Sequence, residues 1–245
     1  RSNFLTELSL RTASHQSLHM IAVSLLSFSD LNLQFGHQTG DTILYETARK
    51  LDRLFPQGGT FRVSSLSFVL VLPMETAQLA DERLEIVQRA LRTPLVLGEV
   101  RCLLTYCVAD LRCNGQETAD QLVEYLEYTL SLAKGSRGTV HFNEEVRRSL
   151  EQKHTMISML RRSIQERRFR VWYQPLYCCH EHRFCSAEAL LRLTDYDGAQ
   201  VSPDVSIPLA EETGMIGELT WIVLEEICRL LSSGQVPGLR CVSLN

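Results

Sequence analysis

A carboxylate and an amide stand in strand-like runs toward the end of the chain. Glu188 lies in the apolar run 184–193, and Asn245 ends the run 239–245. A carboxylate among alanine and leucine side chains is costly to bury without a partner. A divalent metal would supply that partner, and carboxylate and amide oxygens suit Mg²⁺ or Mn²⁺. The alternative is a structural ion pair between Glu188 and an arginine such as Arg192.

Cysteine and histidine residues crowd the segment just before the run that holds Glu188. They are Cys178, Cys179, His180, His182 and Cys185. Their spacing fits no standard zinc pattern. The segment is predicted to turn between two strands, where successive side chains alternate in direction. We therefore expect exposed histidines and half-buried cysteines here rather than a metal site.

The elements that position these groups fall into two sets, and the first set covers residues 1–142. Strand-like runs are expected at 19–28, 61–63, 68–72, 95–97, 100–109 and 139–142. Apolar residues at helical spacing predict helices at 40–55, 75–91 and 117–133. The order β-α-β-β-α-β-β-α-β predicts a mainly antiparallel sheet with helices packed on it.

The second set follows a change in composition. Residues 143–170 are rich in Arg and Glu, contain no Gly or Pro, and are predicted to form a connecting helix and lead-in. Strands are then expected at 171–177, 184–193 and 239–245, with helices at 203–213 and 219–231. Strands that alternate with helices favour a parallel α/β architecture. The predicted organisation is therefore 1–142, 143–170 and 171–245.

Composition narrows the classes of function. The chain has 245 residues, 44% hydrophobic and 22% charged, with a net charge of -4, which disfavours nucleic acid as the main partner. No apolar run reaches the ~18–20 residues that a membrane span needs. The 8 cysteines form no C-x-x-C pair, so we expect reduced thiols in a cytoplasmic domain. The chain begins at Arg1 without Met and ends in a strand-like run, and we interpret it as a piece of a longer protein.

The segment FSDLNLQFGHQTGDTILYETARKL resembles the signature of GGDEF diguanylate cyclases. This resemblance covers roughly residues 1–142 and implies a GGDEF-like fold. In that family, carboxylates hold divalent metal against GTP for phosphoryl transfer. The matching positions are Phe28, Asn32, Gly36, His37, Gly40 and Asp41, with Arg62 and Lys134 further along.

The positions that would do the cyclase chemistry depart from the family pattern. Ser24 replaces an Asp on the first strand, Leu33 replaces the second residue of the guanine-reading pair, and Ser67 replaces the metal-binding Glu. The hairpin reads Ser64-Ser65-Leu66-Ser67-Phe68, and Phe55 and Gly58 stand at the family's inhibitory product site. We expect neither cyclase activity nor product binding there. The resemblance favours a scaffold or dimerisation module, with a GTP sensor as the alternative, its residual nucleotide contacts being Asn32 and Lys134.

A second resemblance begins after the connecting segment. The chain is similar there to the start of EAL phosphodiesterases. The resemblance implies that these residues form the first strands and helices of a β/α (TIM-like) barrel. The matching motifs are Tyr173-Gln174-Pro175, Glu188-Ala189-Leu190-Leu191-Arg192, Ser202-Pro203, residues 207–214 and the final Asn245. Leu193 and Ser206 depart from the family pattern, which has Trp and Phe at these positions.

The EAL resemblance implies roles for particular residues. Glu188 would be catalytic and, with Asn245, would bind Mg²⁺ or Mn²⁺. Gln174, Leu190 and Arg192 would hold the cyclic dinucleotide. In such enzymes the metal activates water for attack on a phosphodiester. The family's remaining metal carboxylates follow this Asn, so we expect no hydrolysis by residues 1–245 alone.

Three hypotheses follow for the parent protein. The first is a bacterial cyclic di-GMP phosphodiesterase that yields linear pGpG and carries an inactive regulatory GGDEF-like domain. The second is a non-catalytic receptor that binds cyclic di-GMP and signals through protein partners, and the third is a pure interaction scaffold. A homodimer is compatible with both domain types. Composites of this kind often carry amino-terminal membrane segments, which leaves inner-membrane anchoring of the parent open.

Overall fold

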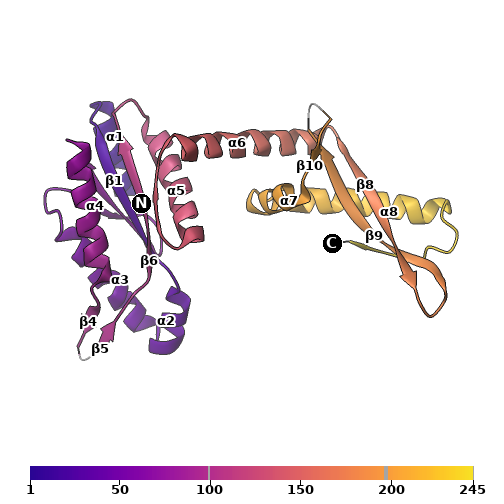
Figure 1. Cartoon of the computed structure of the whole chain (residues 1–245), viewed down its shortest axis with the longest axis horizontal. Helices are drawn as coiled ribbons and strands as arrows, with labels where there is room; N and C mark the ends of the chain where they lie inside the picture. Colours follow the sequence, from indigo (N-terminus) through magenta and orange to yellow (C-terminus); the bar gives the residue numbers. More distant parts are fainter. Residues whose placement is uncertain (99, 196–197, 245) are drawn as a thin grey trace. The chain divides into compact units, whose positions relative to one another are not determined.

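The structure of the chain, a computed structural model, describes residues 1–98, 100–195 and 198–244, without the side chains of Gln34, Phe35 and Val100. The chain divides into two compact units, Arg1–Leu150 and Glu151–Asn245. The division falls inside helix α6 (Glu144–Gln165), within the predicted connecting segment 143–170. Figure 1 shows the order of the elements in each unit.

A five-stranded sheet forms the centre of unit 1. Its order is β2-β3-β1-β6-β7, with β1 in the middle. Strand β1 pairs antiparallel with β3 and β6, β2 pairs antiparallel with β3, and β7 pairs parallel with β6. The predicted mainly antiparallel sheet is confirmed. Its strands are β1 (Leu18–Leu25), β2 (Gly59–Arg62), β3 (Ser67–Pro73), β6 (Tyr106–Cys113) and β7 (Thr139–His141).

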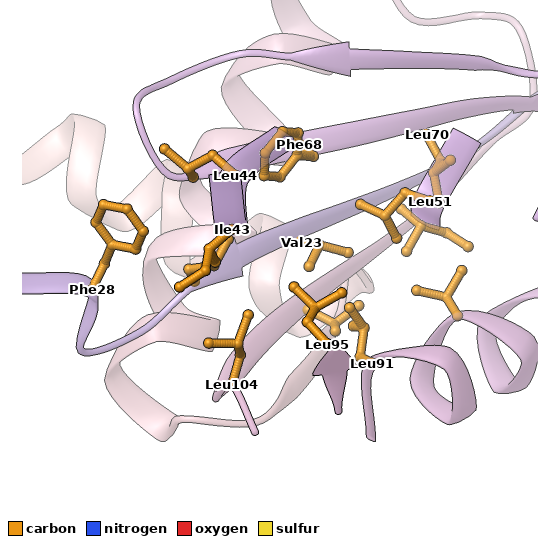
Figure 2. Close-up of a cluster of buried hydrophobic side chains, with 14 of the residues drawn as sticks. Val23, Phe28, Ile43, Leu44, Leu51, Phe68, Leu70, Leu91, Leu95 and Leu104 are labelled. Carbon is orange, nitrogen blue, oxygen red and sulfur yellow. The ribbon is translucent and has the colours of Figure 1, made fainter. Parts of the chain in front are cut away.

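Helices cover both faces of this sheet because side chains of β1 alternate between two apolar clusters. Ile21 and Val23 pack on one face with α2 (Phe28–Phe35), α3 (His37–Asp52) and α4 (Ala77–Arg92). Figure 2 shows Val23, Phe68 and Leu70 of the sheet facing the leucine and isoleucine side chains of α3. Met20 and Ala22 pack on the other face with α1 (Ser2–Ala13) and α5 (Ala119–Ser136).

Some boundaries in unit 1 differ from the sequence predictions. The predicted strand 100–109 is broken into β5 (Val100–Cys102), which pairs with β4 (Leu95–Leu97), and β6. The break occurs where Leu103 is exposed and Leu104 turns into the core beside α4. Helix α3 begins at His37 rather than near residue 40, and α2 was not predicted. The left-handed backbone at Ser27 ends β1 and starts that extra helix.

Unit 2 is built around the long strand β9 (Arg183–Thr194). It pairs antiparallel with β8 (Phe169–Cys178) and β10 (Gln200–Val201), and parallel with β11 (Cys241–Leu244). Helices α7 (Pro203–Glu212) and α8 (Ile216–Ser233) connect β10 to β11. The parallel β9–β11 step is the predicted start of a β/α barrel, and the described residues do not close one.

Helix α8 covers one face of this sheet. Val223 and Ile227 pack against Ala189, Leu191 and Val242. A second cluster joins Leu160 of α6 to Leu193 and Leu219. Within the described residues, no helix combines the length and apolar character needed to cross a membrane.

Candidate functional site

The face of the unit 2 sheet that points away from α8 carries the polar residues predicted from sequence. Ala189 and Leu191 point toward α8, so Glu188, Leu190 and Arg192 lie on the opposite face. Gln174 of β8 is directly opposite Glu188 in the antiparallel register. The structure therefore brings all four predicted side chains, Gln174 included, onto one face of adjacent strands.

The Glu188 carboxylate has no hydrogen bond or ion pair with any described residue. Its neighbour in the parallel register is Ser243, whose Oγ contacts the backbone oxygen of Ala187 at 3.5 Å instead. The side chain is half-buried, with Gln174 and Ser243 as its neighbours on the two adjacent strands. The carboxylate is therefore accessible to solvent or to a ligand.

Arg192 does not form the ion pair with Glu188 that was the alternative interpretation of the sequence. Its Nη1 donates a hydrogen bond to the backbone oxygen of Leu191 at 3.0 Å, and its guanidinium lies 5.7 Å from the centre of the Trp172 ring. A cation over an indole face is an attractive arrangement. Trp172 therefore orients the Arg192 guanidinium on the face that also carries Glu188.

A second arginine adds positive charge to the same face. Arg170 of β8 is directly opposite Arg192 of β9. Like charges at directly opposed positions are destabilising, and a bound anion such as a phosphate would relieve that repulsion. Sequence reasoning missed both Arg170 and Trp172, although each is separated by an even number of residues from Gln174 and so shares its face.

The donor set around Glu188 suits a hard divalent cation. The carboxylate, the Gln174 amide and the Ser243 hydroxyl are all oxygen ligands, the type that Mg²⁺ and Mn²⁺ prefer. Mg²⁺ is commonly held by one or two carboxylates, with water and phosphate oxygens filling its other positions. Asn245, the other predicted ligand, lies outside the described residues.

The cyclase-like positions of unit 1 have a different character. Ser24 of β1 and Ser67 of β3 are opposite each other, each is 1% exposed, and Ser67 Oγ donates to Ser24 Oγ at 3.0 Å. Cys107 of β6 flanks Ser24 on its other side and is also buried. These neutral side chains satisfy one another, and a divalent metal does not fit this donor set.

The hairpin between β2 and β3 is held by an arginine. Arg62 donates from Nη2 to the backbone oxygen of Ser65 at 2.7 Å and from Nε to that of Ser64 at 3.3 Å. Ser64 and Ser65 are exposed, while Leu66 packs against the α3 side of the core. The backbone oxygens at the tip of the hairpin are therefore hydrogen-bonded to Arg62.

The predicted residual nucleotide contacts are only partly assembled. Asn32 Oδ1 is buried without a hydrogen-bond partner, Leu33 is 86% exposed, and Lys134 is exposed on α5. A hollow of about 460 Å³ lies nearby, lined by side chains that include Asp41, Tyr45 and Arg62. Tyr45 was not singled out from sequence. It lies four residues after Asp41 on α3, and this spacing places both side chains on the same face of the helix.

Comparison with known proteins identifies both parts of the chain. Residues 1–138 match the family model "Diguanylate cyclase, GGDEF domain", and residues 157–245 match the model "EAL domain". An "Uncharacterized signaling protein" of Caulobacter vibrioides is 29% identical over 244 residues, which is 95% of this chain and 30% of that protein.

Two further proteins extend this comparison. The bifunctional diguanylate cyclase/cyclic di-GMP phosphodiesterase MucR of Pseudomonas aeruginosa is 26% identical over 217 residues, 86% of this chain and 31% of MucR. The chain thus spans about 30% of the length of these relatives. The S helix-GGDEF-EAL structure of Vibrio cholerae LapD, bound to c-di-GMP, aligns with 100% of this chain and 58% of its own at a TM-score of 0.54. With 15% identity, that likeness shows the fold alone.

Proposed function

The chain belongs to the GGDEF domain family and continues into an EAL domain, and from this premise we propose that it is part of a cyclic di-GMP phosphodiesterase. The EAL domain of the whole protein would open cyclic di-GMP to the linear dinucleotide. The single observation that carries the proposal is the Glu188 carboxylate, which faces Gln174 and lacks a partner among the described residues.

The residues of the Glu188 face have separate tasks in this proposal. Glu188, together with Asn245, would hold Mg²⁺ or Mn²⁺. When bound, such an ion lowers the pKa of a water molecule and so supplies the nucleophile. Arg192, oriented by Trp172, would neutralise a phosphate of the substrate, and Gln174 would donate a hydrogen bond to it.

Unit 1 would regulate rather than synthesise. Phosphoryl transfer from GTP needs carboxylates that hold metal against the triphosphate. The mutual hydrogen bond of Ser24 and Ser67 at the corresponding positions supports the absence of that chemistry. In this proposal the GGDEF domain contributes a folded module that passes signals to the EAL domain.

A non-catalytic cyclic di-GMP receptor is the second candidate. It is favoured by the opposed Arg170 and Arg192 side chains, which can bind a phosphate without any metal. The receptor would signal through protein partners instead of turnover.

Incubation of the full-length natural protein with cyclic di-GMP or with GTP, in Mg²⁺ or Mn²⁺, tests the proposal. We expect cyclic di-GMP to be consumed, the linear dinucleotide to appear, and GTP to stay intact. Addition of EDTA should stop the hydrolysis. Binding without turnover would replace the phosphodiesterase with the receptor, and neither binding nor turnover would leave only an interaction scaffold.

A further inference from the structure

The turn between β8 and β9 brings together three side chains that can bind a metal. The Sγ atoms of Cys178 and Cys185 and a carboxylate oxygen of Glu181 all lie within 4.8 Å of one another. Both cysteines are half-buried free thiols. The cluster differs from the Cys and His residues that crowd this segment of the sequence, because it omits both histidines and includes Glu181.

A register shift in the hairpin explains how these thiols meet. Tyr177 pairs with Phe184, but Leu176 pairs with Ser186, so Cys185 is an extra residue in β9. Such a bulge changes the direction of a side chain relative to simple alternation. The Tyr177 and Phe184 rings, whose centres are 5.2 Å apart, fix the register beside it. Alternation alone therefore could not reveal the pairing of the two thiols.

The ligand atoms of the cluster are close enough to bind one metal ion together. Zn–S bonds of about 2.3 Å place two thiolates of a tetrahedral site about 3.8 Å apart. Cys178 pairs with Arg183, which makes Cys185 its diagonal neighbour in the ladder.

Two arginines hold the third ligand in place. Glu181 accepts from Arg183 Nε at 2.7 Å and from Arg240 Nη1 at 2.9 Å. The backbone N–H of Arg240 also donates to the Cys185 oxygen at 2.9 Å, so the segment that leads into β11 is bound to the same hairpin. The thiolate is the form that binds metal. Burial, followed by the neighbouring Cys178 and Glu181 groups, raises the pKa of the Cys185 thiol, so the ion must displace its proton.

We propose that Cys178, Cys185 and Glu181 form a binding site for a thiophilic divalent cation such as Zn²⁺. Each thiol loses its proton to solvent when the ion binds. Solvent completes the tetrahedron. The bound ion ties the ends of β8 and β9 together, and through Glu181 and Arg240 it also tethers the start of β11. These are the strands that carry the Glu188 face.

Titration of the reduced, metal-free chain with Co²⁺ tests the site. The expected result is one equivalent of tetrahedral Co²⁺ with thiolate-to-metal charge-transfer absorption, which Zn²⁺ displaces. Cys178→Ser and Cys185→Ser should each remove the charge-transfer band and weaken Zn²⁺ binding at least about 100-fold. This loss should exceed the effect of mutating a residue that only hydrogen-bonds to a metal ligand. Cys228→Ser, which alters an exposed thiol of α8, is the matched control and should leave both unchanged.

Three outcomes overturn the proposal. One is the lack of a thiolate band in the wild-type chain, and another is a band that survives in both hairpin variants while their circular dichroism stays native. The third is a wild-type chain that binds no Co²⁺ and, on treatment with a mild disulfide oxidant, loses two hydrogens and links Cys178 to Cys185. That result would assign the pair to a redox bond instead.

Discussion

At the residue scale, two buried serines face each other on neighbouring strands of unit 1. Ser24 and Ser67 are buried neighbours that hydrogen-bond at 3.0 Å. Two carboxylates in their place would repel each other and lack solvation unless a cation lay between them. The neutral serine pair therefore avoids the cost of burying two carboxylates without a cation at this position.

We predict that the double variant Ser24→Asp, Ser67→Glu loses about 3–5 kcal/mol of unfolding free energy in EDTA, because it buries uncompensated charge. Mg²⁺ should recover part of this loss by binding the new carboxylates. Urea unfolding with and without Mg²⁺ measures both effects. The control Ser24→Ala should cost only about 1 kcal/mol and show no response to Mg²⁺. A double variant as stable as the wild type in EDTA would contradict this interpretation.

Asp110 is a buried carboxylate inside unit 1. It is 1% exposed and contacts His19 Nε2 at 2.6 Å, His141 Nδ1 at 2.9 Å and Arg112 Nε at 3.1 Å. Burial by itself would raise the pKa of Asp110, but the hydrogen bonds of both histidines and the Arg112 charge outweigh it and lower the pKa below its ordinary value. The folded state therefore favours the ionised carboxylate.

This lowered pKa predicts a pH-dependent stability. The contribution of Asp110 is present above its unfolded pKa of about 3.9 and is lost as pH falls through the lower folded pKa. Asp110→Asn should cost about 3–5 kcal/mol near pH 7 because it breaks a buried network. The difference from wild type should shrink below about pH 4. Urea unfolding across this range measures it, and a difference that does not change with pH would refute the assignment.

At the scale of elements, the junction of α2 and α3 depends on a glycine. A Cβ built at Gly40 would lie 2.0 Å from Asn32 Oδ1, so a larger residue there would force the Asn32 side chain to move. Gly40→Ala should destabilise unit 1 by about 1–3 kcal/mol through overpacking, although alanine is the better helix former.

Gly135→Ala is the matched control for this prediction. Gly135 lies on α5, and no atom lies within 4 Å of the position that a Cβ would take there, so alanine should stabilise by about 0.5–1 kcal/mol. Thermal unfolding of both variants gives the sign of each effect. Equal shifts in the same direction would show that helix propensity, and not the Asn32 contact, governs Gly40.

The elements also show where sequence patterns succeed and fail. The EAL resemblance was enough to name Gln174, Glu188 and Arg192, and the regular register of β8 and β9 places them on one face. The bulge at Cys185 and the break before β6 escaped prediction because each depends on tertiary contacts rather than on periodicity. The contact between Arg192 and Trp172 was not predicted either, because the sequence does not show which residue of the neighbouring strand Arg192 contacts.

At the scale of the whole molecule, the two units differ in how completely they bury their sheets. In unit 1, both faces of the central sheet are covered by apolar clusters. In unit 2, Trp172 is 55% and Phe184 61% exposed on β8 and β9. Unit 1 therefore has the features of an independently stable domain, and the described part of unit 2 leaves large apolar side chains in contact with solvent.

We predict that residues 1–150 fold alone and unfold cooperatively in urea, because their contacts are largely internal to the unit. Far-ultraviolet circular dichroism and the near-ultraviolet signal of the tyrosine and phenylalanine residues should follow one transition. A fragment with helical signal but no cooperative transition would contradict the division of the chain at Leu150.

The measurement that tests the central claim most directly is cyclic di-GMP hydrolysis by the full-length protein with Glu188→Gln. The substitution keeps the size of the side chain and removes its charge, so we predict at least about a 100-fold loss of turnover in Mg²⁺ or Mn²⁺. Dinucleotide binding should persist through Arg192 and Gln174. Glu218→Gln, an exposed carboxylate on α8, should leave turnover unchanged. Undiminished hydrolysis by the Glu188 variant would contradict the account.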